Sequence, residues 1–126
     1  MKEVVAIIRM NMVNKTKAAL LEAGFPFFTC RKVMGRGKKK VDFVMIEDAL
    51  IGEIVDKGVA EQASEAYRLI SKRMIILLVK DEDVDKVVNE IIKVNSTGNP
   101  GDGKIFITNV IDVARIRTGE RGEAAI

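Results

Sequence analysis

Apolar residues along the chain follow two patterns, one typical of strands and one typical of helices. Val4–Ile8 is a continuous apolar run rich in β-branched residues, and Phe27–Met34, Met74–Val79 and Ile105–Ile107 have a similar strand-like composition. The first and third runs place apolar side chains at consecutive positions. We therefore expect four strands, with apolar side chains on both faces of the sheet that they form.

Two further segments have the spacing of amphipathic helices. We expect the first to begin at Asn14 as its N-cap and to end at Gly24. The second follows the acidic run Asp81–Asp83, which places negative charge at the positive end of the helix dipole. Its apolar positions recur at the intervals expected of one helix face: Val84, Val87, Val88, Ile91 and Ile92.

The order strand, helix, strand occurs twice and predicts an α+β fold over one domain, residues 1–126. It fits a ferredoxin-like βαββαβ sandwich, in which an antiparallel sheet carries two helices on one face. The other face of the sheet then needs a cover. Self-association would supply it, and so would the C-terminal tail at 110–126 if it folded back, and the sequence leaves both open.

Composition excludes several classes of function. The 126 residues contain no His and one Cys, so Zn and Cu sites and His-activated nucleophiles cannot be assembled. We expect neither an enzyme nor a metal site. The formal charge of +3 and the few aromatic residues argue against nucleic-acid binding. The absence of a long apolar run, of a cleavable signal pattern and of a second Cys to pair with Cys30 predicts a cytoplasmic protein with no membrane insertion.

A long connection, at about residues 38–70, separates the two halves of the repeat. Ordinary connections have about 4 to 6 residues, so this one is expected to be functional or disordered. Its N-terminal stem is basic, whereas Glu47–Glu65 contains six acidic residues and a single base. This pattern fits a segment that binds a target, and it also fits a solvated, partly helical surface loop without a target.

Three segments combine glycine with positive charge: Gly35–Lys38, Gly98–Lys104 and Arg115–Arg121. Glycine lets backbone N–H groups approach phosphate oxygens, and Lys and Arg supply the charge, so the three together suggest a polyphosphate site. The second segment is not a Walker A loop, because Ile105 stands where Ser or Thr would be needed and a strand follows instead of a helix.

Several stretches resemble the signature of the PII family of nitrogen-regulatory signal proteins. The similar stretches are Ala6–Arg9, Val33–Gly37, Asp81–Val88, Thr97–Gly98, Gly101–Phe106 and Arg115–Glu120, and the likeness covers nearly the whole chain outside Val41–Leu69. The resemblance implies a ferredoxin-like homotrimer that binds ATP or ADP between subunits, senses 2-oxoglutarate beside Mg-ATP and docks on targets through an extended T-loop.

The resemblance also assigns roles to individual residues. The ATP or ADP site would be formed by Thr29, Gly35, Gly37, Lys38, Gly101, Asp102, Gly103, Lys104, Arg115 and Arg117. Lys72 and Lys39 would bind 2-oxoglutarate. Lys39 stands where the family commonly has a Gln that ligates Mg²⁺, and a cation there would repel the metal, so metal-dependent sensing of 2-oxoglutarate is expected to be impaired.

The long loop distinguishes branches of the family. It lacks the run around the Tyr that is uridylylated in many bacteria, so we expect no uridylylation. The chain most resembles the nitrogen-fixation-linked branch, which implies binding to nitrogenase, at its dinitrogenase component, by a homotrimer or by a mixed oligomer with a related subunit. Regulation of an ammonium transporter, or of another nitrogen-assimilation target such as glutamine synthetase, is the alternative. A trimeric scaffold that has lost ligand binding is a third possibility.

Overall fold

The computed structural model describes residues 1–37 and 69–126, and the expected loop at 38–70 lies mostly outside these ranges. Four strands form one antiparallel sheet in the order β2-β3-β1-β4. The strands are β1 (Lys2–Arg9), β2 (Thr29–Gly35), β3 (Ile70–Val79) and β4 (Lys104–Asn109). This order, with the two helices described next, confirms the ferredoxin-like prediction.

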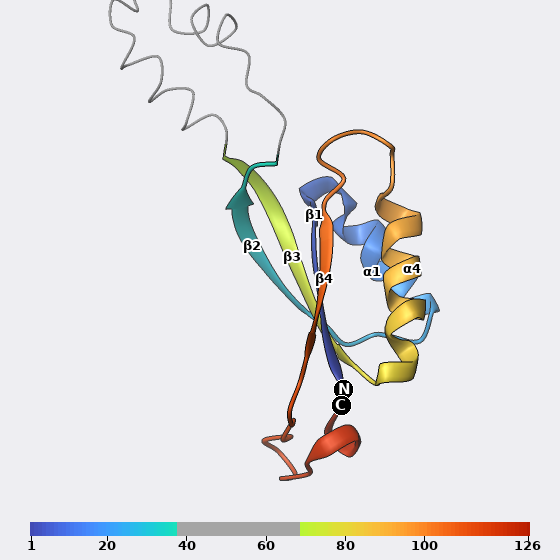
Figure 1. The fold of residues 1–126 in the computed structure, drawn as a ribbon, viewed down its shortest axis with the longest axis vertical. Helices are drawn as coiled ribbons and strands as arrows, with labels where there is room; N and C mark the ends of the chain where they lie inside the picture. The colour runs from blue at the N-terminus through green and yellow to red at the C-terminus, as the bar shows by residue number, and fades with distance from the viewer. Residues whose placement is uncertain (38–68) are drawn as a thin grey trace, which may run out of the picture.

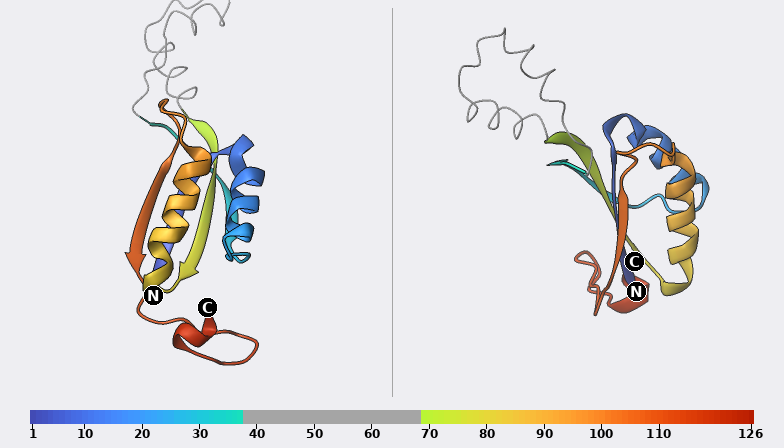
Figure 2. Two further views of the ribbon diagram at one scale, coloured as in Figure 1. Left: turned by 90° about the vertical axis from the view of Figure 1, so that its right-hand side faces the viewer. Right: turned by 45° about the horizontal axis from the view of Figure 1, so that its top comes forward.

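Both helices, α1 (Val13–Glu22) and α4 (Val84–Asn95), lie on the same face of the sheet and pack against each other (Figures 1 and 2). Each is preceded by a short 3₁₀ turn, η1 (Met10–Met12) and η2 (Asp81–Asp83). A third such turn, η3 (Gly122–Ala125), lies near the end of the chain.

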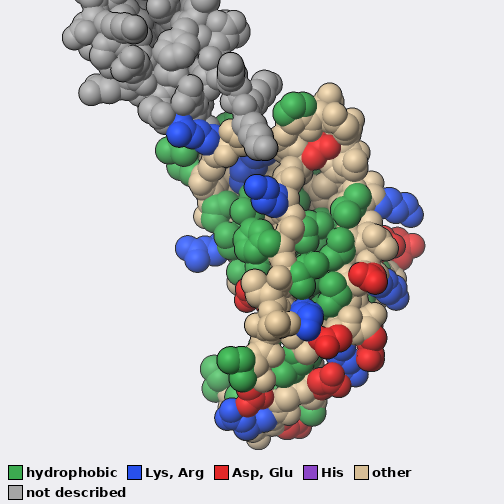
Figure 3. Space-filling model, in the orientation of Figure 1, with side chains coloured by type: hydrophobic (Ala, Val, Ile, Leu, Met, Phe, Trp, Pro, Cys, Tyr) green, Lys and Arg blue, Asp and Glu red, His purple; other side chains and the backbone are tan. Residues whose placement is uncertain are grey.

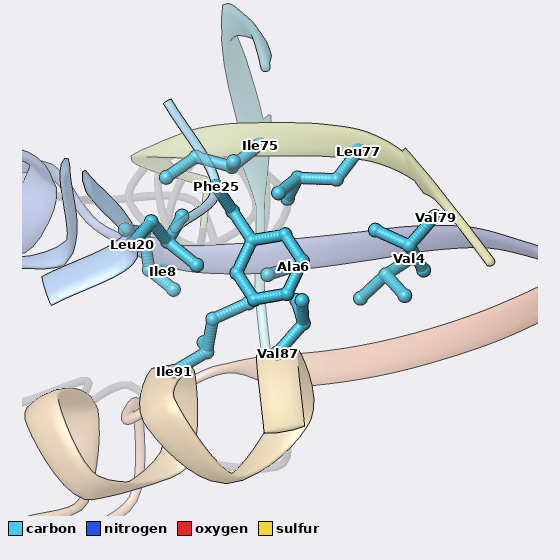
Figure 4. Packing of buried hydrophobic residues seen from close by; sticks show 10 residues of the cluster. All are labelled: Val4, Ala6, Ile8, Leu20, Phe25, Ile75, Leu77, Val79, Val87 and Ile91. Atoms are coloured by element: carbon cyan, nitrogen blue, oxygen red, sulfur yellow. The ribbon is translucent and has the colours of Figure 1, made fainter. Parts of the chain in front are cut away.

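The core lies between the sheet and the two helices (Figure 4). Alternate residues of β1 point into it, and β3, the helices and the turn after α1 supply the rest. Its buried members are Val4, Ala6, Ile8, Leu20, Phe25, Ile75, Leu77, Val79, Val87 and Ile91. One polar link crosses between the helices, where Asn95 Nδ2 donates to Thr16 Oγ1 at 3.0 Å.

The boundaries of the elements differ from the sequence prediction in two ways. All four strands were placed correctly in order, but three are longer than expected because their polar ends are paired in the sheet. The prediction that Asn14 is the N-cap of the first helix is wrong, because η1 leads directly into α1, which begins at Val13. The predicted stop is confirmed: Gly24 has φ +96°, and the Phe25 N–H donates to the Leu20 carbonyl at 2.8 Å.

The sheet face opposite the helices carries apolar side chains. Val5 lies between Phe106 and Ile76 in the register of the sheet, and Phe106 is 42% exposed. The tail after β4 lies past the end of the sheet and does not cover this face (Figures 1 and 2), so the fold-back alternative is wrong. Cys30 is also exposed, on edge strand β2.

Two absences concern the described residues alone. Neither α1 nor α4 is long and apolar enough to cross a membrane. Within residues 1–37 and 69–126 there is also no group of three His, Cys, Asp or Glu side chains that could hold a metal ion.

Candidate functional site

A glycine-rich loop connects α4 to β4 at the end of the sheet where β1 ends and where β2 and β3 lead toward residues 38–68 (Figure 1). Gly103, with φ +116°, lies directly against the backbone of β1, and a Cβ there would overlap the carbonyl oxygen of Ile7. Only glycine fits this approach without a shift of the chain. The loop is thereby held close to the end of the central strand.

The carboxylate of Asp102 closes this loop on itself. Its Oδ2 accepts from the backbone N–H groups of Thr97, at 2.7 Å, and Gly98, at 3.0 Å. Its Oδ1 accepts from the Thr97 hydroxyl and from the Arg9 guanidinium, the latter at 2.6 Å. The Thr97 hydrogen bonds, together with the Arg9 guanidinium, hold the pKa of Asp102 well below its ordinary value. Asp102 is therefore ionised throughout the neutral range.

Two cations from neighbouring strands hold the other side of the loop. Arg9 ends β1, Lys72 lies opposite it in β3, and they donate to the carbonyls of Pro100, at 3.2 Å, and Gly101, at 2.8 Å. Partial burial and then the charge of Arg9 lower the pKa of Lys72, while Asp102 raises it. Two positive groups and one carboxylate leave a net positive charge where Lys72 and Gly101 meet, which suits a bound anion.

The structure gathers part of the predicted site at this end of the sheet. Lys72 and Gly101–Lys104 lie together there, and Gly35 is paired with Ile70, two residues before Lys72. Gly37 is the last described residue before the long connection, and Lys38 and Lys39 lie outside the described residues. The Asp102 carboxylate, which was expected to contact nucleotide, already accepts four hydrogen bonds within the protein.

The remaining predicted residues lie elsewhere in the same chain. Thr29 begins β2, beside Ile76. Arg115 and Arg117 belong to the tail, which lies at the opposite end of the sheet from the glycine loop (Figure 1). Within one copy, the three glycine-bearing segments therefore do not converge.

The tail has an internal structure in which its two candidate arginines differ. Arg115 Nη1 donates to Glu120 Oε2 at 2.8 Å, and its Nη2 donates to the carbonyl of Ala124 at 3.1 Å. Arg121 binds the carboxylate of Asp112 and so lowers the pKa of that group. Arg115 thus contributes to holding the tail in shape, whereas Arg117 is exposed.

A groove of about 350 Å³ lies between α4 and β4, and the glycine loop lines one end of it at Asp102–Lys104. Its walls include Val88, Ile92 and Ile107, and Figure 3 shows hydrophobic side chains gathered along both sides of β4. Because these walls are mainly apolar, the groove is unsuited to an anion, and the charged cluster remains the candidate functional site.

Arg9 and Thr97 are central to the cluster, but the sequence argument gave neither a role. Arg9 carries the one detectable signal, a charge that directly ends the apolar run of β1. Thr97 carries none beyond its position in a turn-rich stretch. Both contacts depend on residues brought together by the fold, and Arg9 and Asp102 are 93 positions apart.

The chain thus combines a ferredoxin-like sheet and helix pair with a glycine loop, held by Arg9 and Lys72, beside the long connection between β2 and β3. The sequence profile described as "Nitrogen regulatory protein P-II" matches residues 1–120. The chain therefore belongs to the P-II family, whose members are regulatory signal-transduction proteins.

Relatives in methanogenic archaea are similar over the full length of the chain. "Nitrogen fixation nifHD region GlnB-like protein 2" of Methanothermococcus thermolithotrophicus is 47% identical over 128 residues, covering 100% of this chain and 98% of that protein. The protein of the same description from Methanobacterium ivanovii is 45% identical over 130 residues, covering 100% and 99%. "Nitrogen regulatory protein P-II 2" of Methanothermobacter thermautotrophicus is 42% identical over 129 residues, covering 100% and 97%.

Proposed function

We propose that this protein binds ATP or ADP together with 2-oxoglutarate in the cytoplasm, and controls nitrogenase by direct binding through the loop at about 38–70. The observation that carries the proposal is the hydrogen bond from Lys72 to Gly101. This bond joins β3, the strand that follows the long loop, to the glycine segment that is expected to hold phosphate. A ligand bound at this contact therefore acts on both the end of the long loop and the glycine segment.

The nucleotide site lies between two copies of the chain. One copy supplies the backbone N–H groups of Gly101–Lys104, the Lys104 charge and the Gly35–Lys38 segment, and a neighbouring copy supplies Thr29, Arg115 and Arg117. Support comes from the separation of these groups within one chain and from the exposed ring of Phe106 on the sheet face opposite the helices, which association would bury. We propose a trimer, built from this chain alone or with a related subunit.

2-Oxoglutarate binds beside the nucleotide at Lys72, with Lys39 as a second cation. Arg9 supports this assignment, because it lies opposite Lys72 and adds its positive charge where the anion would bind. A bound dicarboxylate would also relieve the repulsion between the two cations. With Lys39 in place of the usual Gln, 2-oxoglutarate binding depends less on Mg²⁺ than in relatives that have the Gln.

The regulated target is nitrogenase, at its dinitrogenase component. The names of the relatives, which refer to the nifHD region, support this partner. Ligands at the root of the loop shift its population between a binding and a non-binding state, and they can do so only by the difference in their affinity for the two states.

The nucleotide site shared between copies is tested by mixing two variants that each bind ATP weakly. Lys104→Ala removes a group from one half of the site and Arg117→Ala from the other half, so each variant alone should lose ATP affinity by roughly tenfold to a hundredfold. Co-assembled, the two variants should regain wild-type affinity at a fraction of the sites, where both halves are intact. Calorimetry that finds no high-affinity sites in the mixture would refute a site shared between copies.

The target is tested by deleting Glu47–Glu65 from the loop. The deletion should abolish inhibition of nitrogenase and leave ATP affinity unchanged. Unchanged inhibition would exclude docking through this loop. If the wild-type protein binds an ammonium transporter or glutamine synthetase and leaves nitrogenase untouched, the target is wrong and the ligand site stands.

A further inference from the structure

The β2–β3 hairpin carries an exposed surface outside the candidate site, on the sheet face that α1 and α4 share. Lys32 and Arg73 lie opposite each other in the register of β2 and β3. Arg73 is two residues before Ile75, which points into the core, so both side chains lie on the helix side of the sheet. At this end the hairpin leans away from the helices (Figure 1), and Lys32 is exposed while Arg73 is partly buried.

Two like charges directly opposite each other destabilise a sheet unless an anion lies between them. Among residues 1–37 and 69–126, no carboxylate forms an ion pair with Lys32 or Arg73. A carboxylate placed between Lys32 and Arg73 would reduce their repulsion, and the described part of the chain supplies none.

An apolar side chain borders this pair of cations. Met34, on the same face of β2, is 62% exposed, and Cys30 is exposed two residues before Lys32. Arg and Met, represented here by Arg73 and Met34, are both enriched at protein interfaces. We call Cys30, Lys32, Met34 and Arg73 the hairpin surface.

We propose that the hairpin surface binds an acidic surface of a partner protein, with carboxylates placed between Lys32 and Arg73 and an apolar group on Met34. Carboxylates are the expected ligands because their negative charge complements Lys32 and Arg73. This contact goes beyond the proposed role of the long loop and does not depend on which protein is the target.

The test measures binding of a fluorescein-labelled peptide of repeating Glu-Glu-Leu by fluorescence anisotropy, with a Gln-Gln-Leu peptide of equal length as the uncharged comparison. The wild-type protein should bind the acidic peptide, more weakly as salt increases, and bind the Gln peptide at least about tenfold more weakly. Lys32→Glu with Arg73→Glu should reduce acidic-peptide affinity by about tenfold or more. Lys32→Arg should retain it.

Matched controls separate a local contact from a general charge effect. Lys15→Glu with Lys93→Glu makes the same change in net charge on α1 and α4 and should leave peptide affinity within about threefold of wild type. Equal losses in the two double variants, or no loss in the hairpin variant, would overturn the proposal. Tighter binding to duplex DNA or to phosphatidylserine vesicles through the same two residues would also overturn it.

Reversing the charge of Lys32 alone tests whether its side chain faces Arg73. Lys32→Glu places a carboxylate opposite Arg73, so it should raise the thermal midpoint and at the same time weaken peptide binding. A lowered midpoint would mean that the two side chains do not face each other, and the proposal would fall. An acidic segment of the chain itself is the competing occupant, and a gain in peptide affinity after deletion of 47–65 would favour it over a separate partner.

Discussion

Lys72 and Gly101 are 29 positions apart, and a hydrogen bond of 2.8 Å from Nζ to the carbonyl oxygen joins them. Lys72 lies near the start of β3, directly after the long connection, and Gly101 lies in the loop before β4. This bond directly links the start of β3 to the loop before β4. A ligand that accepts from the Lys72 ammonium therefore contacts a group that also holds the Gly101 carbonyl.

Lys72→Ala should remove 2-oxoglutarate binding more than ATP binding. Loss of a charge-assisted hydrogen bond predicts a decrease in 2-oxoglutarate affinity of about tenfold to a hundredfold, measured by calorimetry with ATP present. Lys15→Ala, on the exposed surface of α1, is the control and should have no effect. Wild-type 2-oxoglutarate affinity in Lys72→Ala would exclude this residue from the site.

Asp102→Asn should loosen the glycine loop and change the response of stability to acid. Because hydrogen bonds lower the pKa of Asp102 in the folded state, its contribution to stability is fully present above the unfolded carboxyl pKa of about 3.9. That contribution is lost as the pH falls below this value, toward the folded-state pKa.

Acid unfolding followed by circular dichroism tests this prediction. The Asn variant should be less stable than wild type at pH 7, and the difference should shrink below about pH 4. Glu22→Gln, on the exposed end of α1, serves as the matched loss of a carboxylate. A stability difference that does not change between pH 7 and acid would show that the Asp102 charge is unimportant.

Gly103→Ala should be far more damaging than Gly98→Ala. Both glycines have positive φ, but a Cβ at Gly103 meets the Ile7 carbonyl, whereas no described residue other than its chain neighbours lies within 4 Å of a Cβ at Gly98. We expect a loss of roughly 3 kcal/mol or more for Gly103→Ala and about 1 kcal/mol for Gly98→Ala, from urea denaturation. Equal losses would mean that the loop is free to move away from β1.

Arg115→Ala and Arg117→Ala should differ in kind. Arg115 binds Glu120 and two tail carbonyls, so its loss should make residues 110–126 more sensitive to proteolysis as well as weakening ATP binding. Arg117→Ala should weaken ATP binding by about tenfold to a hundredfold and leave tail proteolysis unchanged. Increased proteolysis of both variants would contradict the division of roles.

Ile91→Ala and Ile92→Ala test the core with neighbouring residues of α4. Ile91 is 1% exposed and packs in the core, whereas Ile92 is 50% exposed at the rim of the groove. Truncation of Ile91 should cost about 2 to 5 kcal/mol in unfolding free energy, and truncation of Ile92 about 1 kcal/mol or less. Similar losses at both positions would indicate that the groove is covered in the assembled protein.

The secondary structure could be predicted from the sequence where a local pattern determines it. The apolar spacing of α4 and the Gly24 stop of α1 both depend on residues within a few positions of one another. The beginning of α1 was mispredicted because a 3₁₀ turn satisfies the backbone there, and no side-chain cap is needed. The strand ends were missed because cross-strand pairing, which has no local signature, includes polar residues such as Lys2 and Lys72.

The candidate site was only partly predictable for the same reason. Gly101–Lys104 is a local motif and was recognised as such. The contact of Arg9 with Asp102 depends on the fold bringing the end of β1 to the loop before β4. The use of the Asp102 carboxylate within the loop was also hidden from sequence, since an acidic residue between two glycines gives no indication of its partners.

Gly35 and Ile70 are paired across the end of the hairpin from which residues 38–68 extend. This pairing closes the sheet at the junction, and the core described for residues 1–37 and 69–126 is complete on both sides of it, between the sheet and the two helices. We therefore expect substitutions in the connection to affect folding less than substitutions in this core. If the connection is the target-binding segment, as proposed, one recognition sequence could replace another while the sheet and helices stay the same.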